Sequence, residues 1–207
     1  MNLNFIKDYY PNLLSWKELS QIINVRPILT SARVHVIDVD ETKLTWEKTH
    51  WEVDDCIPPQ LLIDFLQDHV VYLSEMSRCS KKINDLCAVI EKEYESPTDA
   101  HIYICKDPKI IHPFGIHYDY SHNVIVQCEG KTNFKVWDEI EDKNIKRCNM
   151  PITESPILEI DMEPGDAIFI PAYYPHLATS CRSRMSVSFP FPFHNDYVIP
   201  NRDWVEI

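Results

Sequence analysis

Glycine is scarce in this sequence of 207 residues, which contains only Gly115, Gly130 and Gly165. Each is therefore expected where no other residue fits. Gly165 follows a proline in EPGD, a composition typical of a type II turn with glycine at the position of positive φ. Gly115 lies two residues before His117, where the backbone is expected to approach another group closely. All three lie in the second half of the chain, which is where we expect the chemistry.

Long apolar runs are also absent, and none approaches the length of a membrane span. The first residues show no apolar stretch followed by a small-residue cleavage site, which argues against a secretory signal. The seven cysteines form no CxxC pair, so reduced and mostly buried thiols are expected. Together these absences predict a cytoplasmic protein without a membrane segment.

Positive charge is in short supply, because 20 Lys and Arg against 32 Asp and Glu give a formal net charge of -12. Such a surface repels a phosphate backbone, so we expect no extended nucleic-acid binding. A small basic patch and a nucleotide substrate are not excluded. Internal repeats and low-complexity linkers are absent as well, which predicts a single domain over residues 1–207.

The first 99 residues are predicted to be a mixed lead-in of helices and one strand. The sequence from Ser15 has a capping-box pattern that opens a short helix to about residue 23. Helical periodicity indicates two further helices at 59–73 and 80–95, the first with a proline at its start. Residues 32–39 alternate between apolar and polar as a strand does.

From residue 100 onward the sequence consists of short apolar or alternating runs separated by turn residues. Six runs are expected to be strands: 100–106, 123–129, 133–139, 156–161, 166–171 and 184–191. Short strands at this spacing predict a mainly β protein with an antiparallel sandwich or barrel. The lead-in is therefore followed by a β core at 100–193 and a C-terminal tail at 194–207.

His117 and Asp119 have the spacing of two metal ligands on one strand, because residues i and i+2 of a strand point the same way. A mononuclear iron site uses two histidines and one carboxylate and leaves open positions opposite them. The third ligand must come from a distant strand, and the best candidate is His176, which follows the apolar run at 166–171. The remaining histidines show no ligand spacing: His35, His50, His69, His101, His112, His122 and His194.

The motif HYD at 117–119, followed by EPGDAIFIPAYYPH at 163–176, resembles the JmjC and cupin-like hydroxylases. These are Fe(II)- and 2-oxoglutarate-dependent oxygenases, and the resemblance covers residues 100–193. It implies a double-stranded β-helix (cupin or jelly-roll) core with N-terminal and inserted helices packed on it. It also implies that His117, Asp119 and His176 hold Fe(II).

The same resemblance implies a set of contacts to the co-substrate 2-oxoglutarate. Asn123 stands six residues after the first histidine, where the family often has an asparagine that contacts it. The family's usual lysine or arginine, fifteen residues after that histidine, is Thr132 here. Arg184 and Ser186 share one face of a late strand and are expected to bind the distal carboxylate instead, with a hydroxyl contact from Thr132. The alternative is that Arg184 pairs with a surface acid. Tyr103 is a further expected contact.

Strand parity sorts the neighbouring polar and aromatic residues. His122 has the opposite parity to the two ligands and is expected to face away from the metal. Tyr118 and Tyr120 alternate with the ligands, so we expect them to pack behind the site. Tyr173 and Tyr174 are expected to line its rim.

The leading prediction is an oxygenase that hydroxylates an unidentified substrate, or demethylates it through hydroxylation. Because the expected cation is replaced by Thr132, a cupin-type metal enzyme that does not use 2-oxoglutarate stays open, as does a non-catalytic cupin-like binding module. The expected substrate is a small molecule or an exposed protein side chain. The helices at 59–73 and 80–95 are expected either to form a homodimer or to cover the barrel.

Overall fold

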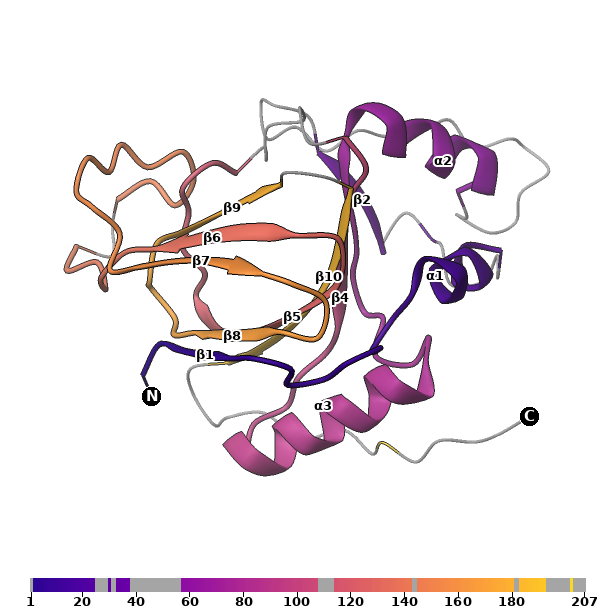
Figure 1. Ribbon diagram of the computed structural model, residues 1–207, viewed down its shortest axis with the longest axis horizontal. Coiled ribbons are helices and arrows are strands. Elements are labelled where there is room, and N and C mark those ends of the chain that lie inside the picture. Colours follow the sequence, from indigo (N-terminus) through magenta and orange to yellow (C-terminus); the bar gives the residue numbers. More distant parts are fainter. Residues whose placement is uncertain are drawn as a thin grey trace.

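The computed structural model describes residues 2–24, 30, 33–37, 57–107, 114–142, 145–180, 183–192 and 202. Within these residues, strands form two antiparallel sheets, with helices packed outside them (Figure 1). The predicted strand at 32–39 is described only from residue 33 to residue 37. His50, His112, His194 and most of the predicted tail lie outside the described residues.

The strands are β1 (Asn4–Ile6), β2 (Val34–Ile37), β3 (Val70–Leu73), β4 (His101–Cys105), β5 (Ser121–Glu129), β6 (Thr132–Val136), β7 (Leu158–Met162), β8 (Ala167–Ile170), β9 (His176–Ser180) and β10 (Arg184–Pro192). The helices are α1 (Trp16–Ile23), α2 (Pro59–Asp68) and α3 (Lys81–Tyr94). The larger sheet has the order β1-β8-β5-β10-β4-β3-β2, and the smaller sheet has the order β7-β6-β9. The predictions of a mainly β protein and of all six strands after residue 100 are therefore confirmed.

The helix predicted at 59–73 is wrong in its last part. α2 ends at Asp68, and the chain continues as β3, which is hydrogen-bonded between β2 and β4. Val70, Val71 and Leu73 are buried there, and β-branched residues suit such a position better than a helix. The strands β1 and β9 were not predicted, because β1 has only three residues and the β9 sequence HLATS does not alternate between apolar and polar residues.

The start of the first helix agrees with the sequence pattern. The backbone N–H of Glu18 donates to the hydroxyl of Ser15 at 3.2 Å, and the N–H of Ser15 donates to the Glu18 carboxylate at 2.8 Å. This reciprocal pair is the predicted capping box. The helix predicted at 80–95 is confirmed as α3.

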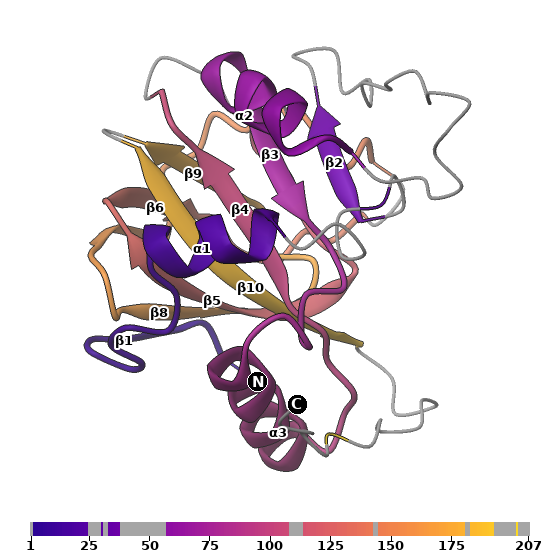
Figure 2. The same cartoon turned by 90° about the vertical axis from the view of Figure 1, so that its right-hand side faces the viewer.

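Two hydrophobic cores lie on opposite faces of the larger sheet. The first core joins this sheet to the helices, for example through Leu19 of α1, Leu62 of α2 and Ile83 of α3. Figure 2 shows α1 lying across the larger sheet on the side away from the smaller sheet. The second core lies between the two sheets and includes Ile125 and Phe134. Apolar side chains therefore fill one part of the space between the sheets. Polar side chains line the remaining part.

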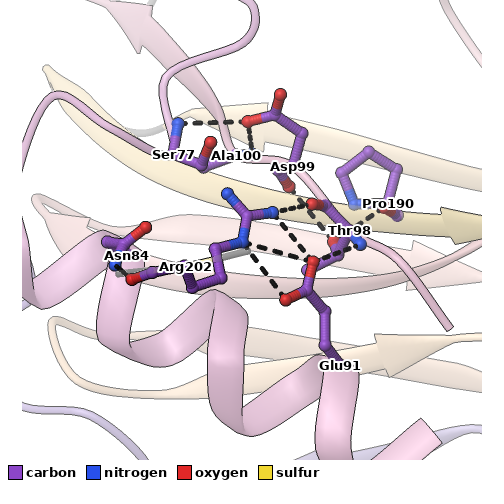
Figure 3. A network of polar contacts seen from close by, with 8 residues as sticks. All are labelled: Ser77, Asn84, Glu91, Thr98, Asp99, Ala100, Pro190 and Arg202. Atoms are coloured by element: carbon purple, nitrogen blue, oxygen red, sulfur yellow. Dashed lines mark hydrogen bonds and ion pairs between the residues drawn. The ribbon is translucent and has the colours of Figure 1, made fainter. Parts of the chain in front are cut away.

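Arg202 is bound to α3 through polar contacts that are largely shielded from solvent (Figure 3). Its guanidinium forms an ion pair with Glu91, at 2.8 Å between Nη2 and Oε1, and it also donates to the carbonyl oxygen of Thr98. The side-chain amide of Asn84 donates to the carbonyl oxygen of Arg202 at 2.9 Å. Partners from outside the helix thus satisfy two buried polar residues of α3.

Membrane-spanning helices and the state of the cysteines can both be assessed in the described residues. In the described part of the chain, no helix combines the length and the apolar character needed to cross a membrane. The cysteines recorded there are free: Cys79, Cys87, Cys105, Cys128 and Cys148. Burial raises the pKa of Cys79, Cys87 and Cys128 to about 12, so these three are neutral thiols at physiological pH.

Candidate metal centre

The three predicted ligands lie together at one end of the space between the sheets. His117 and Asp119 are in the loop before β5, and His176 is the first residue of β9. One donor atom from each lies within 4.8 Å of the others. The Nε2 atom of His176 is 3.8 Å from Oδ2 of Asp119, and the two imidazole centroids are 4.3 Å apart. This spacing and this donor set suit one metal ion bound on one side.

An isolated antiparallel bridge joins the two histidines through their backbones. The N–H of His117 donates to the carbonyl of His176 at 3.0 Å, and the N–H of His176 donates back at 2.7 Å. His117 and Asp119 were expected on a strand, whereas they precede one. The bridge keeps this loop extended, and the pocket between the sheets is lined by both residues, as strand parity requires.

Backbone carbonyls set the orientation of both imidazole rings. Nδ1 of His117 is 3.1 Å from the carbonyl oxygen of Gly115, and Nδ1 of His176 is 3.0 Å from that of Tyr174. A carbonyl only accepts, so each Nδ1 carries the proton and donates it. Each Nε2 is then left with a lone pair for a metal, which is the usual arrangement around metal-bound histidine.

The electrostatics keep His117 neutral. Burial and, after it, the neighbouring His176 lower the pKa of His117 to about 4, although the charge of Asp119 works in the other direction. The neutral imidazole is the form that binds a metal. The local environment therefore keeps this histidine in the form that could bind a metal across the neutral pH range.

A pocket continues from the three ligands into the space between the sheets. Polar residues from three strands of the larger sheet line it, and apolar residues of β6 and β9 face them. Among the predicted co-substrate contacts, the pocket is lined by Tyr103, Asn123, Arg184 and Ser186. Thr132 is not part of the lining, but it contacts Arg184 from behind.

Arg184 is a buried cation at the far side of this pocket, with 4% of its surface exposed. Its Nη1 is 3.5 Å from the hydroxyl of Thr132, which in turn donates to Gln127 at 2.8 Å. Its Nε has no hydrogen-bond partner, and no carboxylate of the described residues forms an ion pair with it. Burial lowers its pKa. A buried guanidinium in this state is suited to bind an anion.

The two lysines that flank Thr132 point away from the pocket, as their parity predicts. Lys131 pairs with Asp161 at 2.9 Å, and Lys135 pairs with Glu159 at 3.1 Å. Both pairs are well exposed to solvent. Arg184 is therefore the cation that the described residues place in the pocket wall.

Most of the remaining polar groups of the pocket are also buried, among them Asn123, Ser186 and Ser188. The hydroxyl of Ser188 donates to the side-chain oxygen of Asn123 at 2.7 Å. This bond orients the Asn123 amide so that its NH₂ group stays available to a ligand. Tyr103 lies opposite Ser186 in the sheet, and burial raises its pKa well above the ordinary value. Its phenol is therefore a neutral hydrogen-bond donor.

The neighbouring residues divide much as parity predicts, with one correction. His122 lies on the other face, where it stacks on Phe169 and accepts from the N–H of Ala172 at 3.1 Å. Tyr118 is fully buried. Tyr120 was expected to pack behind the site, but 57% of it is exposed. The strand begins only at Ser121, so the loop before it does not continue the strand's alternation through Tyr120.

Tyr173 and Tyr174 are half-buried near the site. Tyr173 has a φ of 66°, in the left-handed region that is costly for a bulky residue. Its N–H donates to the carbonyl of Asp119 at 2.9 Å, and its ring packs near those of Tyr118 and Tyr120. The strained residue thereby ties the loop that precedes His176 to the loop that carries Asp119.

Sequence reasoning missed one charged residue near the metal site, Arg147. Its carbonyl accepts from the N–H of Tyr118 at 3.3 Å, and its guanidinium carbon is 5.8 Å from the ring centroid of Tyr120. Burial lowers the pKa of Arg147, but a hydrogen bond with Cys148 and the charge of Asp119 outweigh it and raise the pKa overall. No motif marks Arg147, because it lies in an irregular segment brought to the site by tertiary contacts alone.

A model of the family described as the JmjC domain matches residues 73–197. Among curated proteins, the chain is similar to the bifunctional lysine-specific demethylase and histidyl-hydroxylase NO66 of Aedes aegypti, with 22% identity over 178 residues. That match covers 83% of this chain and 27% of the relative. The NO66 protein of Drosophila persimilis is 21% identical over 172 residues, which is 82% of this chain and 24% of that relative. The chain thus spans about a quarter of the length of these curated relatives.

Among solved structures, the fold is similar to that of YcfD, a ribosomal oxygenase from Escherichia coli. The YcfD complex with cobalt and 2-oxoglutarate has a TM-score of 0.63 and 15% identity, and the match covers 94% of this chain and 49% of that chain. Another YcfD structure has a TM-score of 0.61 and 17% identity, with the same coverage. These likenesses establish the fold.

Proposed function

The chain belongs to the JmjC domain family, and from that premise we propose that it is an Fe(II)- and 2-oxoglutarate-dependent oxygenase. Its reaction is the hydroxylation of a C–H bond, or demethylation through hydroxylation of a methyl group. The observation that carries this proposal is the cluster of His117, Asp119 and His176, whose donor atoms lie within 4.8 Å of one another. Two imidazoles and one carboxylate are the ligand set of non-haem Fe(II) oxygenases.

In this proposal, the Nε2 atoms of His117 and His176 and the carboxylate of Asp119 hold the iron. The backbone carbonyls that accept from both Nδ1 atoms keep the rings in position before the metal binds. The iron, when bound, supplies the activation of oxygen that drives oxidation of the C–H bond. The protein's part is to hold the ligands, place the co-substrate and keep the pocket dry.

Arg184 is the proposed partner of the distal carboxylate of 2-oxoglutarate. It is buried, it lines the same pocket as the three ligands, and its Nε lacks a partner among the described residues. A carboxylate bound there would neutralise the buried charge and fill the unsatisfied donor. Thr132 supports the guanidinium from behind, which accounts for a hydroxyl at the place where relatives are expected to have a cation.

Further contacts to 2-oxoglutarate are proposed for three residues of the larger sheet. Asn123 offers its amide NH₂, Tyr103 its hydroxyl and Ser186 its hydroxyl, and all three line the pocket. These are short-range hydrogen-bond donors around a dianion, so they add orientation as well as affinity. The apolar side chains of Ile125 on β5 and of Phe134 on the facing sheet also line the pocket, where they exclude water.

The proposed substrate is a protein side chain, with a small molecule as the other candidate. The curated relatives are named for lysine demethylation and histidine hydroxylation, and the solved relative is named as a ribosomal oxygenase. We also propose that residues 1–207 form one domain, because β1 pairs with β8 and Arg202 is bound to α3. The homodimer and the cytoplasmic location stay predictions.

Succinate formation from 2-oxoglutarate tests the proposal without a known substrate. Purified protein is stripped of metal and then given Fe(II), 2-oxoglutarate and oxygen, with succinate as the readout. We expect slow, iron-dependent succinate formation that is absent from His176→Ala. If the wild-type protein neither forms succinate nor binds 2-oxoglutarate with iron present, the proposal fails.

A further inference from the structure

A segment after β6 is fastened to the loop that carries the first two ligands. The N–H of Asn149 donates to the carbonyl of Phe114 at 2.9 Å, and the N–H of Met150 donates to that of Ile116 at 2.9 Å. Gly115 and Asn149 both have a left-handed φ, of 53° and 52°. A Cβ on Gly115 would lie 2.4 Å from Oδ1 of Asn149. Gly115 is therefore the close-approach point expected from the sequence, and the group that approaches it is Asn149.

This attachment gives Arg147, two residues before Asn149, a defined place beside the loop that carries the two ligands. The carbonyl of Arg147 accepts from the N–H of Tyr118, the residue between the two ligands. Its guanidinium packs on the exposed ring of Tyr120, an arrangement that favours a cation. In the part of the chain that the structure describes, no carboxylate lies within ion-pair distance of this guanidinium.

A row of aromatic rings leads from the pocket toward the edge of the larger sheet. In the strand register, Tyr103 lies opposite Tyr72, and Tyr72 lies opposite His35. The ring centroids of Tyr103 and Tyr72 are 5.2 Å apart with planes at 20°, and those of Tyr72 and His35 are 4.3 Å apart at 13°. Because the stacked ring faces cover one another, a ligand can contact this row only at the ring edges. The two tyrosines carry hydroxyls at those edges.

The charge of Arg147 reaches this row as well as the metal site. Burial raises the pKa of Tyr72, and the positive charge of Arg147 works against that shift. Burial likewise dominates at Tyr103, where Arg147 again acts in the opposite direction. Both phenols therefore stay protonated at neutral pH, and they share their surroundings with one guanidinium. The groups gathered here are hydrogen-bond donors and a cation, which match a ligand rich in acceptors.

We propose that Arg147, with the hydroxyl of Tyr72, selects a substrate that carries a carboxylate near the carbon to be oxidised. The inference rests on the proposed oxygenase function. The co-substrate's own carboxylate is assigned to Arg184, so Arg147 remains for the substrate. A guanidinium binds a carboxylate through two parallel hydrogen bonds. It also disfavours a cationic target such as a methylated lysine, because like charges at the same site repel.

Binding of matched probes to a catalytically silent complex tests this inference. The protein is loaded with Zn(II) and saturating N-oxalylglycine, so that the co-substrate position is filled. Saturation-transfer NMR then compares N-acetylglutamate amide with N-acetylglutamine amide, and a glycine–alanine octapeptide containing Glu with the same peptide containing Gln. A preference in the first pair indicates a small-molecule acid as the substrate. A preference only in the second pair indicates an acidic residue within a peptide.

We expect the acidic member of a pair to bind about tenfold more tightly to the wild-type protein, the size of one charge-assisted contact. Arg147→Gln removes that preference, and Arg147→Glu turns it toward the corresponding lysine peptide. Lys146→Gln is the matched control, because it removes the same charge from the exposed neighbouring residue, and it keeps the preference. The charge reversal separates recognition from a merely structural role of Arg147.

The inference is overturned if acid and amide probes bind the wild-type protein equally, if neither binds, or if Arg147→Gln keeps the preference. The probes are also titrated with Zn(II) alone. Failure of the proposed function shows elsewhere, as a lack of iron-dependent succinate formation by the wild-type protein. An acid preference together with no succinate would thus reject the oxygenase and keep the carboxylate-selecting role of Arg147.

Discussion

Among the single residues of the site, Arg184 is a deeply buried charge without an ion-pair partner among the described residues. A guanidinium with 4% of its surface exposed has lost most of its hydration, and no described carboxylate pairs with it. Such a charge is costly unless a ligand neutralises it. The strand register explains why it points inward, because Arg184, Ser186 and Ser188 alternate along β10 and all three line the pocket.

Arg184→Gln is expected to weaken 2-oxoglutarate binding by about 10- to 100-fold, the range for losing a charged hydrogen bond. Isothermal titration of the Mn(II)-loaded protein measures the change. Lys135→Gln is the matched control, because it removes an equal charge from an exposed pair with Glu159. Equal affinities of wild-type and Arg184→Gln protein would show that another group binds the distal carboxylate.

At the scale of elements, the turn between β5 and β6 supports the start of β10. A Cβ on Gly130 would lie 2.0 Å from the backbone oxygen of Ser183 and 3.1 Å from Cα of Arg184. Its φ of 69° is also in the left-handed region. Gly165 has a φ of 100°, yet its Cβ would meet only Pro11, at 3.4 Å. A side chain at Gly130 would therefore add a steric clash to backbone strain, whereas a side chain at Gly165 would cause backbone strain alone.

Gly130→Ala is expected to lower the free energy of unfolding by more than about 2 kcal/mol, because backbone must move as well as adopt a strained φ. Gly165→Ala is expected to cost about 1–2 kcal/mol from strain alone. Urea unfolding of both variants measures the difference. Equal losses would mean that the backbone oxygen of Ser183 yields without cost.

The ion pair between Arg202 and Glu91 of α3 is a second contact that supports the arrangement of the elements. The two side chains of the ion pair are 10% and 3% exposed, so removing one partner leaves a buried charge. Arg202→Ala is expected to destabilise the protein by about 3 kcal/mol. Lys81→Ala breaks an exposed i,i+4 pair with Asp85 and is expected to cost about 0.5 kcal/mol or less. Thermal unfolding compares them, and a loss from Arg202→Ala no larger than the control's would contradict a buried ionic attachment.

Across the whole molecule, sequence patterns are informative where a local rule governs the structure. Alternation locates the six strands after residue 100, and the capping box locates α1. The run at 70–73 is too short to separate helix from strand, and its place between two other strands decides the outcome. Tertiary pairing of this kind is not encoded in local periodicity.

The same division holds for the candidate site. His117 and Asp119 share a short motif, and His176 follows a turn and strand of a familiar order, so these could be singled out without coordinates. Arg147 could not, because only hydrogen bonds to a loop some thirty positions earlier in the chain bring it beside Tyr118, the residue between the two ligands. Tyr72 likewise stacks on the pocket residue Tyr103 through the register of neighbouring strands rather than through any motif.

The central claim is that the two histidines and Asp119 bind iron in a way that lets 2-oxoglutarate chelate it. Visible absorption of the anaerobic Fe(II)-loaded protein measures this directly, because chelation by the keto acid produces a charge-transfer band. We predict that the band appears when 2-oxoglutarate is added to the wild-type protein and stays absent from His176→Ala. A wild-type protein that binds Fe(II) but gives no band at saturating 2-oxoglutarate would contradict the account.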